Sequence, residues 1–397
     1  MKQTAKIIPC YAADTSGVCA ALYELGGMIA VHDASGVNST YATHDEPRWE
    51  DMQSMIYVSG LTELDAILGN DEKFIADAAA AAADQKPRFI AVCGSPMPMM
   101  IGVDFDAVAA EIEQRSGIRT FALHTNGMHS YPEGASEALL AITKEYVLPP
   151  AETIRNGVNI LGALPLDFGN PEEIPDIRAW LCKNDFSVIS CIAAGDSLDT
   201  IAKAGNAAVN LVVSYSGLAA AEYLYDRFGI PYVCGVPFGG VFSQMLADSL
   251  RHAAESGQPE SPCTSRGTSG RSIAVIGENL IGGSIAAQLG FMGFAAHLIC
   301  PLPHSDKLLM QGDADASSEE EIEQYLAQMQ PCAVIADPLY RFILPKGTRH
   351  IELPHYAFSG RCFERQMQNL TGSRFDAWLS QNGGLACRHC ESDSVAD

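Results

Sequence analysis

Basic side chains are scarce in this sequence of 397 residues. Lysine and arginine together number 25, against 48 aspartates and glutamates, which gives a formal net charge of −23. A chain this acidic repels nucleic-acid phosphates and anionic lipid headgroups, so nucleic-acid binding is excluded as a first interpretation. Charged residues make up only 18% of the chain and hydrophobic residues 47%. That balance excludes global disorder and allows sizeable hydrophobic cores.

Features of secreted and membrane proteins are also lacking. The twelve cysteines are too sparse and scattered for a disulfide scaffold. The N-terminal stretch has no apolar run long enough for a signal peptide, because Pro9 and Asp14 interrupt it. The uncharged stretch 279–302 is long enough to cross a membrane, but glycines and polar side chains interrupt it. We interpret it as a helix followed by a strand, and we expect a cytoplasmic protein with no membrane partner.

Short apolar stretches alternate with helical patterns along the whole chain. Such alternation is typical of parallel sheets covered on both faces. It is interrupted near Pro149 and Pro150, and again at 255–271, which is rich in serine, glycine and proline. We predict an α/β protein with three Rossmann-like domains and parallel sheets around a central cleft. The predicted domains are residues 1–150, 151–262 and 263–397.

The expected elements follow from this pattern. Strands are predicted at 28–33, 88–93, 118–123, 158–165, 187–192, 208–214, 230–236, 272–277, 295–300 and 332–337. Helices are predicted at 71–84, 105–117, 172–183, 217–228, 241–256 and 317–330. Gly117 is expected to end the second of these helices. Because parallel sheets bind ligands at the carboxyl ends of their strands, we expect the site where the three units meet.

A glycine-rich turn at 275–289 links a predicted strand to a predicted helix, as in dinucleotide-binding folds. Gly277 and Gly282 match the first and third glycines of that fingerprint. Asn279 replaces the second, and no acidic residue closes the next strand. Tight packing of helix on strand is therefore favoured, and a nicotinamide-dependent dehydrogenase is the weakest functional alternative.

Two histidines, His124 and His129, lie in the loop 124–131 after a predicted strand. Loops at strand ends in α/β proteins face ligands, so both side chains are candidate proton donors or ligands. The alternative is a polar loop whose histidines are satisfied by hydrogen bonds. The residues of this loop alone favour that alternative.

Several cysteines have positions suited to an iron–sulfur cluster, whose iron prefers thiolates. Cys10 follows the first strand-like stretch, Cys19 lies in the next predicted helix, and Cys93 ends a predicted strand. Their spacing matches no ferredoxin pattern, so the residues alone give this assignment little weight. Cys387 and Cys390 have the CxxC spacing of a zinc or redox pair, but they stand alone in a polar tail.

Four stretches in colinear order resemble the nitrogenase component 1 family, which comprises nitrogenase MoFe-protein subunits, their cofactor-assembly homologues and related reductases of tetrapyrrole synthesis. The closest match, 195–239, follows the patterns G-D-x-x-x-x-I, N-L-V-x-C-Y and G-I-P-x. The segment 9–41 is similar to the family's N-terminal segment, which a cysteine opens, and has Cys10 near its start. The segment 101–112 is similar to I-G-D-D-I-x-x-V, and 353–360 carries a histidine. Together they span essentially the whole chain.

The resemblance implies that Cys10 is the first ligand of a 4Fe–4S-type iron–sulfur cluster at a subunit interface. The second ligand is expected after Gly36, where this chain has Val37. Cys93 lies several residues before the position of the third ligand, and Cys19 has no counterpart in the family. We assign Cys10, Cys93 and Cys19 as candidate metal ligands, with the cluster shared across a subunit interface.

The cysteine that holds the family's active-site cofactor is replaced by Ser214, and a hydroxyl is a poor iron ligand beside a thiolate. No conventional iron–molybdenum cofactor is therefore expected. The chain is nearer to the tetrapyrrole reductases, which use the same cleft for an organic substrate. Histidines titrate near neutral pH and suit proton supply. The cleft residues implied are Ser214, Tyr215 and His32 for cofactor or substrate, and His124, His129 and His355 for catalysis.

The preferred function is that of a catalytic-component subunit of a nitrogenase-like reductase, acting on an unidentified small molecule or tetrapyrrole. Electrons are expected from a separate ATP-dependent iron–sulfur reductase similar to the nitrogenase iron protein. The sequence has no P-loop, so ATP hydrolysis is assigned to that partner. A homologous subunit is the second expected partner, in a dimer or tetramer. The competing hypothesis, a non-catalytic scaffold or cofactor-assembly subunit, is favoured by the missing sulfur at Val37 and Ser214.

Overall fold

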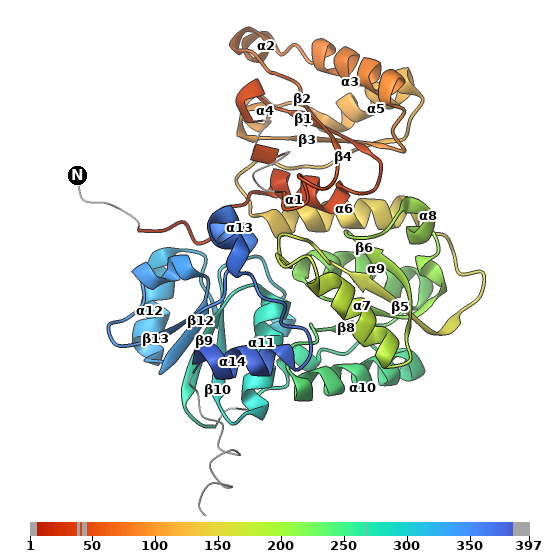
Figure 1. Cartoon of the computed structure of the whole chain (residues 1–397). Coiled ribbons are helices and arrows are strands. Elements are labelled where there is room, and N and C mark those ends of the chain that lie inside the picture. Colours follow the sequence, from red (N-terminus) through yellow and green to blue (C-terminus); the bar gives the residue numbers. More distant parts are fainter. Residues whose placement is uncertain (1–5, 38–39, 42–45, 268, 384–397) are drawn as a thin grey trace, which may run out of the picture.

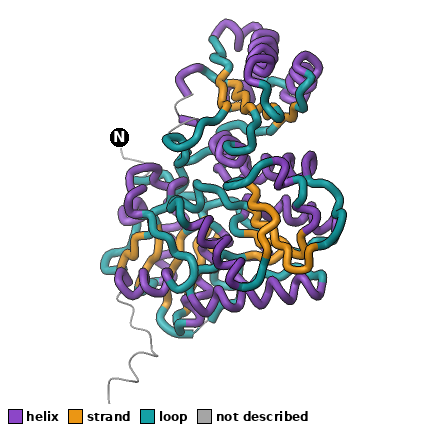
Figure 2. Tube along the Cα trace, turned by 45° about the vertical axis from the view of Figure 1, so that its right-hand side comes forward, coloured by secondary structure: helices purple, strands orange, loops and turns teal. Residues whose placement is uncertain are grey.

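The computed structural model describes residues 6–37, 40–41, 46–267 and 269–383. The protein is α/β, and each of its three sheets is built from one contiguous stretch of chain with all strands parallel. Figure 1 shows the first sheet above the other two, and Figure 2 shows from another side the same three groups of strands flanked by helices. The predicted fold class is confirmed.

The first sheet has the strand order β2-β1-β3-β4. Its strands are β1 (Met28–His32), β2 (Met55–Val58), β3 (Ile90–Gly94) and β4 (Thr120–Ala122). Its helices are α1 (Asp14–Leu22), α2 (Glu63–Leu68), α3 (Glu72–Gln85), α4 (Pro96–Ile101), α5 (Phe105–Ser116) and α6 (Tyr131–Tyr146). Alternate residues of β1 enter different cores: Met28 and Ala30 pack under α3 and α5, whereas Ile29 and Val31 join the core of α1 and α6.

The second sheet has the order β6-β5-β7-β8. Its strands are β5 (Ile154–Leu161), β6 (Ser187–Ile192), β7 (Ala207–Val212) and β8 (Tyr232–Cys234). Its helices are α7 (Glu173–Lys183), α8 (Leu198–Ile201), α9 (Leu218–Phe228) and α10 (Gly240–Ser256). Helix α6 contacts both α1 and α9, so it lies between the first and second domains.

The third sheet has the order β11-β10-β9-β12-β13. Its strands are β9 (Ser272–Ile276), β10 (Ala295–Cys300), β11 (Ala314–Asp315), β12 (Ala333–Ala336) and β13 (Arg349–Glu352). Its helices are α11 (Asn279–Phe291), α12 (Glu319–Met329), α13 (Tyr356–Ser359) and α14 (Arg374–Gly383). Short 3-10 helices are η1 (Ser35–Val37), η3 (Ala204–Asn206), η4 (Tyr215–Gly217), η5 (Pro262–Thr264), η6 (Asp306–Leu308), η7 (Pro338–Phe342) and η8 (Gly360–Gln366).

The predicted strands and helices coincide with observed elements to within a few residues, and Gly117 ends α5 in the left-handed conformation with φ 69°. The stretch 279–302 forms α11 and β10, as interpreted from its pattern. No helix in the described part of the chain is long and apolar enough to cross a membrane. The sequence pattern missed β2, β11 and β13, which are edge strands with partly exposed residues or only two residues.

The described residues of the segment 255–271 contact the neighbouring domains, although its composition is that of a linker. Glu260 pairs with Val233 beside β8, and Cys263 is buried against the third domain. One continuous apolar core therefore joins the second and third domains and the inner face of the first sheet. The domain boundaries at 150 and 262 remain predictions, but each sheet lies wholly within one of the predicted ranges.

Candidate functional site

Each sheet has a topological switch point, where successive strands are added to opposite sides of the first strand. In the second sheet it lies between β5 and β7, and in the third between β9 and β12, because each first strand has later strands on both sides. Ligands of such sheets bind at the carboxyl end of this switch point. The segments that leave these four strand ends carry Asp167, Ser214, Glu278 and Asp337.

Five side chains meet where these strand ends face one another, and we call them the junction cluster: Tyr131, Asp167, Glu278, Asp337 and His355. The Tyr131 hydroxyl, brought by the first turn of α6, donates a hydrogen bond to Asp167 Oδ1. His355 Nε2 lies 3.6 Å from the same oxygen, which is too far for a hydrogen bond. All five are buried except His355, whose side chain is 12% exposed. The cluster thus joins residues of all three domains.

Glu278 occupies the turn between β9 and α11, where its carboxyl group accepts backbone hydrogen bonds. Its Oε2 accepts the N–H groups of Leu280 and Ile281 at 2.9 and 2.8 Å, and its Oε1 accepts the Tyr215 N–H at 2.8 Å. Burial raises the pKa of Glu278 to about 8, and the nearby Asp167 carboxylate adds to this shift. Glu278 is therefore mostly protonated at neutral pH.

The glycine-rich turn is accordingly used for packing and for this carboxyl group. The N–H groups that hold a pyrophosphate in dinucleotide-binding folds are hydrogen-bonded to Glu278. A Cβ on Gly282 would come within 2.5 Å of a Leu298 methyl group, so helix and strand are in close contact there. This agrees with the interpretation of tight packing.

Asp337 holds the segment that carries His355. Its Oδ2 accepts the His355 N–H at 2.9 Å and the Ser359 hydroxyl at 2.7 Å, while its Oδ1 accepts the Leu339 N–H at 2.9 Å. Burial raises the pKa of this carboxyl group. The His355 ring also stacks on Phe358, with centroids 4.5 Å apart. The imidazole is therefore positioned by its backbone and ring face, which leaves its nitrogens available.

Several buried polar atoms of the junction have no hydrogen-bond partner among the described residues. They are Asp167 Oδ2 and both ring nitrogens of His355, together with Ser216 Oγ and Asn279 Nδ2 on neighbouring turns. Nearly all buried polar atoms in proteins are hydrogen-bonded, so such a group of unsatisfied atoms needs a specific explanation. Donors and acceptors that converge in a buried site are suited to a polar ligand.

Four of the predicted site residues lie at this junction. His355 belongs to the cluster, and Tyr215 contacts Glu278 through its backbone. The Ser214 hydroxyl is buried and donates to the Gly162 carbonyl at 2.7 Å. Cys10 is half-buried, with its thiol 3.6 and 3.8 Å from the carbonyls of Ala12 and Ala357.

The other predicted histidines lie in the first domain. His32 stacks on Phe74 at 4.5 Å, and its Nδ1 is 2.8 Å from the Ser59 hydroxyl; burial lowers its pKa. His124 is exposed between Glu137 and Asp106, at 2.9 and 3.2 Å. The hydrogen bond that the His124 ring donates to Glu137 raises the pKa of His124.

His129 is half-exposed, 3.2 Å from Glu133 and 3.7 Å from Asp14. His124 and His129 thus follow the alternative of a polar loop with partnered histidines. Their catalytic assignment, like that of His32, stays a prediction without support from proximity to the junction.

The candidate thiols Cys10, Cys19 and Cys93 belong to no ligand set that the described residues of one chain form. Cys19 is buried in α1, and Cys93 is buried at the end of β3, where burial raises the thiol pKa well above its usual value. A buried protonated thiol is a poor ligand, because thiolates bind iron. The described residues contain no group of three or more His, Cys, Asp or Glu side chains that could hold a metal ion. Cys387 and Cys390 lie outside the described residues.

Tyr131, Asp167, Glu278 and Asp337 were missed by sequence reasoning. Asp337 closes a predicted strand, and Glu278 lies in the conspicuous glycine-rich turn, so both had a positional signal. Asp167 and Tyr131 had none, because their role depends on contact between domains.

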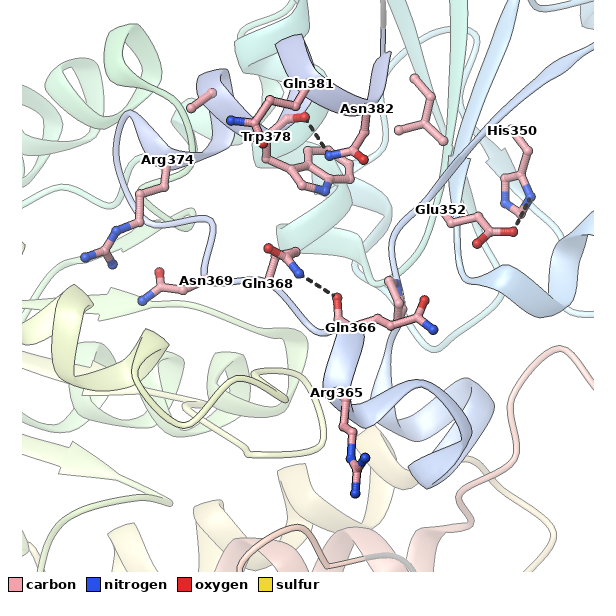
Figure 3. Close-up of a pocket in the computed structure, with 13 residues that line it drawn as sticks. His350, Glu352, Arg365, Gln366, Gln368, Asn369, Arg374, Trp378, Gln381 and Asn382 are labelled. Carbon is pink, nitrogen blue, oxygen red and sulfur yellow. Dashed lines mark hydrogen bonds and ion pairs between the residues drawn. The ribbon is translucent and has the colours of Figure 1, made fainter.

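A surface groove with a volume of about 820 Å³ lies elsewhere, between β13, η8 and α14. Figure 3 shows it lined by polar side chains around Trp378. Gln368 donates a hydrogen bond to the Gln366 carbonyl and Asn382 to the Trp378 carbonyl, while His350 lies 3.8 Å from Glu352. None of the predicted site residues lines it. This groove and the candidate functional residues therefore lie in different parts of the molecule.

Comparison with known proteins places these features in a family. Residues 16–292 match the sequence profile of the nitrogenase component 1 type oxidoreductases. The chain is 29% identical over 194 residues to the nitrogenase iron-molybdenum cofactor biosynthesis protein NifE of Clostridium pasteurianum, covering 48% of this chain and 41% of that protein. It is 33% identical over 116 residues to a subunit of the light-independent protochlorophyllide reductase of Pinus thunbergii, covering 29% of this chain and 22% of that protein.

The chain thus spans less than half the length of these relatives. A structure of the nitrogenase Cp1 at pH 6.5 superposes with a TM-score of 0.70 at 12% identity, covering 100% of this chain and 96% of that one. At that identity the likeness establishes the fold alone.

Proposed function

The chain belongs to the nitrogenase component 1 type oxidoreductase family, and from this premise we propose that it is the catalytic-component subunit of a nitrogenase-like reductase whose substrate binds at the junction cluster. One observation carries the proposal. Asp167 Oδ2 and the His355 ring nitrogens are buried, converge, and have no hydrogen-bond partner among the described residues. Sites that bind and protonate small molecules have this combination of burial and available polar atoms.

Reduction of an unsaturated bond consumes protons as well as electrons, and the junction cluster is suited to supply them. A general acid works best when its pKa lies near the working pH, and the pKa of Glu278 is raised to about 8. His355 and Asp167 lie 3.6 Å apart, so a small rearrangement would bring them into hydrogen bonding with each other or with a substrate. Tyr131 holds Asp167 in place through the hydrogen bond at Oδ1.

Electrons are proposed to come from a separate ATP-dependent iron–sulfur reductase, as the resemblance to two-component enzymes of this family implies. Since the described residues of one chain do not form a metal site, we assign to this chain only Cys10 as a ligand of an iron–sulfur cluster. A homologous subunit would complete the ligand set, and the complex would work in the cytoplasm. The thiol of Cys10 is half-buried beside the junction, which suits a shared interface.

A scaffold or cofactor-assembly subunit is the second candidate, and one observation favours it. Ser214 stands at the position of the family's cofactor-binding cysteine. Its hydroxyl is buried and already donates a hydrogen bond to the Gly162 carbonyl. The similarity to NifE, a cofactor biosynthesis protein by name, points in the same direction.

The decisive experiment is anaerobic co-purification with a P-loop reductase encoded by a neighbouring gene. We expect iron and sulfide in the complex, their loss in Cys10→Ala, and ATP-dependent oxidation of the reduced partner with hydrogen as the default product. Asp167→Asn should retain iron and lose turnover. Iron without turnover in the intact complex would favour the scaffold, and absence of iron and sulfide would refute electron transfer through this chain.

A further inference from the structure

A second cavity, of about 430 Å³, lies where the loops after β5 and β6 meet the first domain and η8. Its walls are mainly apolar and include Met52, Pro165, Phe168, Ile174 and Pro175. Cavities that bind small molecules have this size, mostly apolar walls and a few polar groups that set orientation. It is lined by the loops that follow the carboxyl ends of β5 and β6, the side of a parallel sheet at which ligands bind.

Most polar groups in this cavity are already used. Arg48 donates to Glu24 and Glu46 at 2.6 Å each, and to the Ala20 carbonyl at 2.8 Å and the Ala193 carbonyl at 3.3 Å. Glu24 also accepts the Gly195 N–H at 2.6 Å. These bonds leave neither the guanidinium of Arg48 nor the Glu24 carboxylate available for a ligand.

The same is true of Asn170. Its side-chain oxygen accepts the Glu172 N–H at 3.0 Å, and its amide donates to the Met367 carbonyl at 3.1 Å. The amide therefore stabilises the wall of the cavity and offers little to a bound molecule.

Arg178 is the exception. It projects from α7, half-buried, and its Nη1 would lie 3.6 Å from a Cβ on Gly195, so the guanidinium lies against the cavity wall. It is hydrogen-bonded to the Cys191 thiol and lies near Asp196, but it forms no ion pair with a carboxylate in the described part of the chain. Asp196 accepts the Cys191 N–H instead. A guanidinium with several donors beside an apolar wall is suited to a carboxylate.

The backbone of this wall is held in an unusual conformation. Ala193 has φ 105°, which is unfavourable for any residue with a Cβ, and its carbonyl is held by Arg48. Such strain persists only where surrounding contacts over-determine it, and it is concentrated at functional sites. Here it places Ala194 and Gly195 on the cavity surface, below Arg178.

We propose that this cavity binds a small monocarboxylic acid with an apolar body, its carboxylate paired with Arg178 and its body against Phe168 and Ile174. The single available guanidinium matches one negative charge. Asp51 and Glu364 at the rim repel a phosphate dianion about twice as strongly as a monoanion, so they disfavour the dianion more. This function goes beyond the proposed reductase activity and does not depend on it, because none of the junction cluster lines the cavity.

The test is isothermal titration calorimetry of the full chain with benzoate, benzamide and acetate. Benzoate should bind saturably, and benzamide and acetate about tenfold or more weakly, because one lacks the charge and the other the apolar body. Arg178→Gln should weaken benzoate binding about tenfold and leave benzamide binding nearly unchanged. Arg365→Gln, at an exposed arginine of the third-domain groove, is the matched control and should change neither.

Ile174→Trp provides a second route that leaves Arg178 in place. It should fill the cavity and abolish binding of both benzoate and benzamide, while far-ultraviolet circular dichroism and the thermal transition show a folded protein. The proposal is overturned if benzoate does not bind at millimolar concentration. It is equally overturned if benzamide binds as well as benzoate, or if Arg178→Gln leaves benzoate binding unchanged in a folded protein.

Discussion

The first domain and the junction cluster both contain histidines and carboxylates, but they differ in whether the histidine ring nitrogens are hydrogen-bonded. In the first domain, His124 is exposed with a carboxylate at each ring nitrogen. At the junction, His355 is nearly buried and its ring nitrogens have no hydrogen-bond partner among the described residues. Partnered, exposed polar groups are typical of a solvated surface, whereas buried unsatisfied ones cluster at functional sites. The contrast supports the junction, rather than the loop of His124, as the proposed site of the chemistry.

The largest expected effect on stability comes from the residue that builds the junction. Asp337→Ala would leave the Leu339 and His355 N–H groups and the Ser359 hydroxyl without their acceptor. We expect a loss of about 3 kcal/mol in the free energy of unfolding, measured by urea denaturation. Asp77→Ala is the matched control, because its exposed pair with Lys73 should contribute less than about 0.5 kcal/mol. Equal losses in the two variants would contradict the assigned role of Asp337.

His355→Gln separates function from stability. Because the ring nitrogens form no hydrogen bonds with described residues, the free energy of unfolding should change by less than about 1 kcal/mol. In the reductase assay described above, turnover should fall about a hundredfold, as expected for loss of a general acid. His124→Gln should leave turnover within about twofold of the wild type. If both variants lose turnover equally, the distinction between the two regions is wrong.

The pH dependence of stability tests Glu278. Its folded-state pKa of about 8 lies above the ordinary value of 4.5, so the folded state binds a proton that the unfolded state lacks between these values. The free energy of unfolding therefore falls as pH rises through this window, with a slope of up to about 1.4 kcal/mol per pH unit from this group. Glu278→Gln should remove that slope in urea titrations at pH 5, 6, 7 and 8. Identical slopes in wild type and variant would contradict the buried acid.

The smallest effect is expected at His124. Its raised pKa stabilises the folded state at low pH, and this contribution is lost as pH rises through the folded-state pKa. Because the side chain is 60% exposed, solvent screening limits the gain to about 0.5 kcal/mol at pH 5. Comparing His124→Gln with wild type at pH 5 and pH 9 should show a small difference only at pH 5. A loss above about 1 kcal/mol would mean that this loop is not a solvated surface.

The predicted site residues and the junction cluster overlap in part, for reasons that particular residues show. His355 was found through its segment, and Tyr215 through the motif that carries it, because both follow strand ends that the pattern locates. Asp167 was missed because nothing near it in sequence marks its contact with Tyr131, which comes from another domain. Cys93 was assigned as a ligand from its strand-end position, yet its side chain points into the core. The position of a residue along a strand can be predicted from the sequence. The face that its side chain occupies at a domain boundary cannot.

By itself the sequence determined the alternation of strand and helix, the three-unit order and the family resemblance, because apolar periodicity and turn residues act over short windows. Tertiary structure alone decided that Asp167, Glu278 and His355 meet, that Ser214 is turned to Gly162, and that Arg178 lines a cavity. The physical reason is that these contacts depend on how the carboxyl ends of two sheets face each other. That arrangement comes from the packing of whole domains on a shared core, and no local segment encodes it.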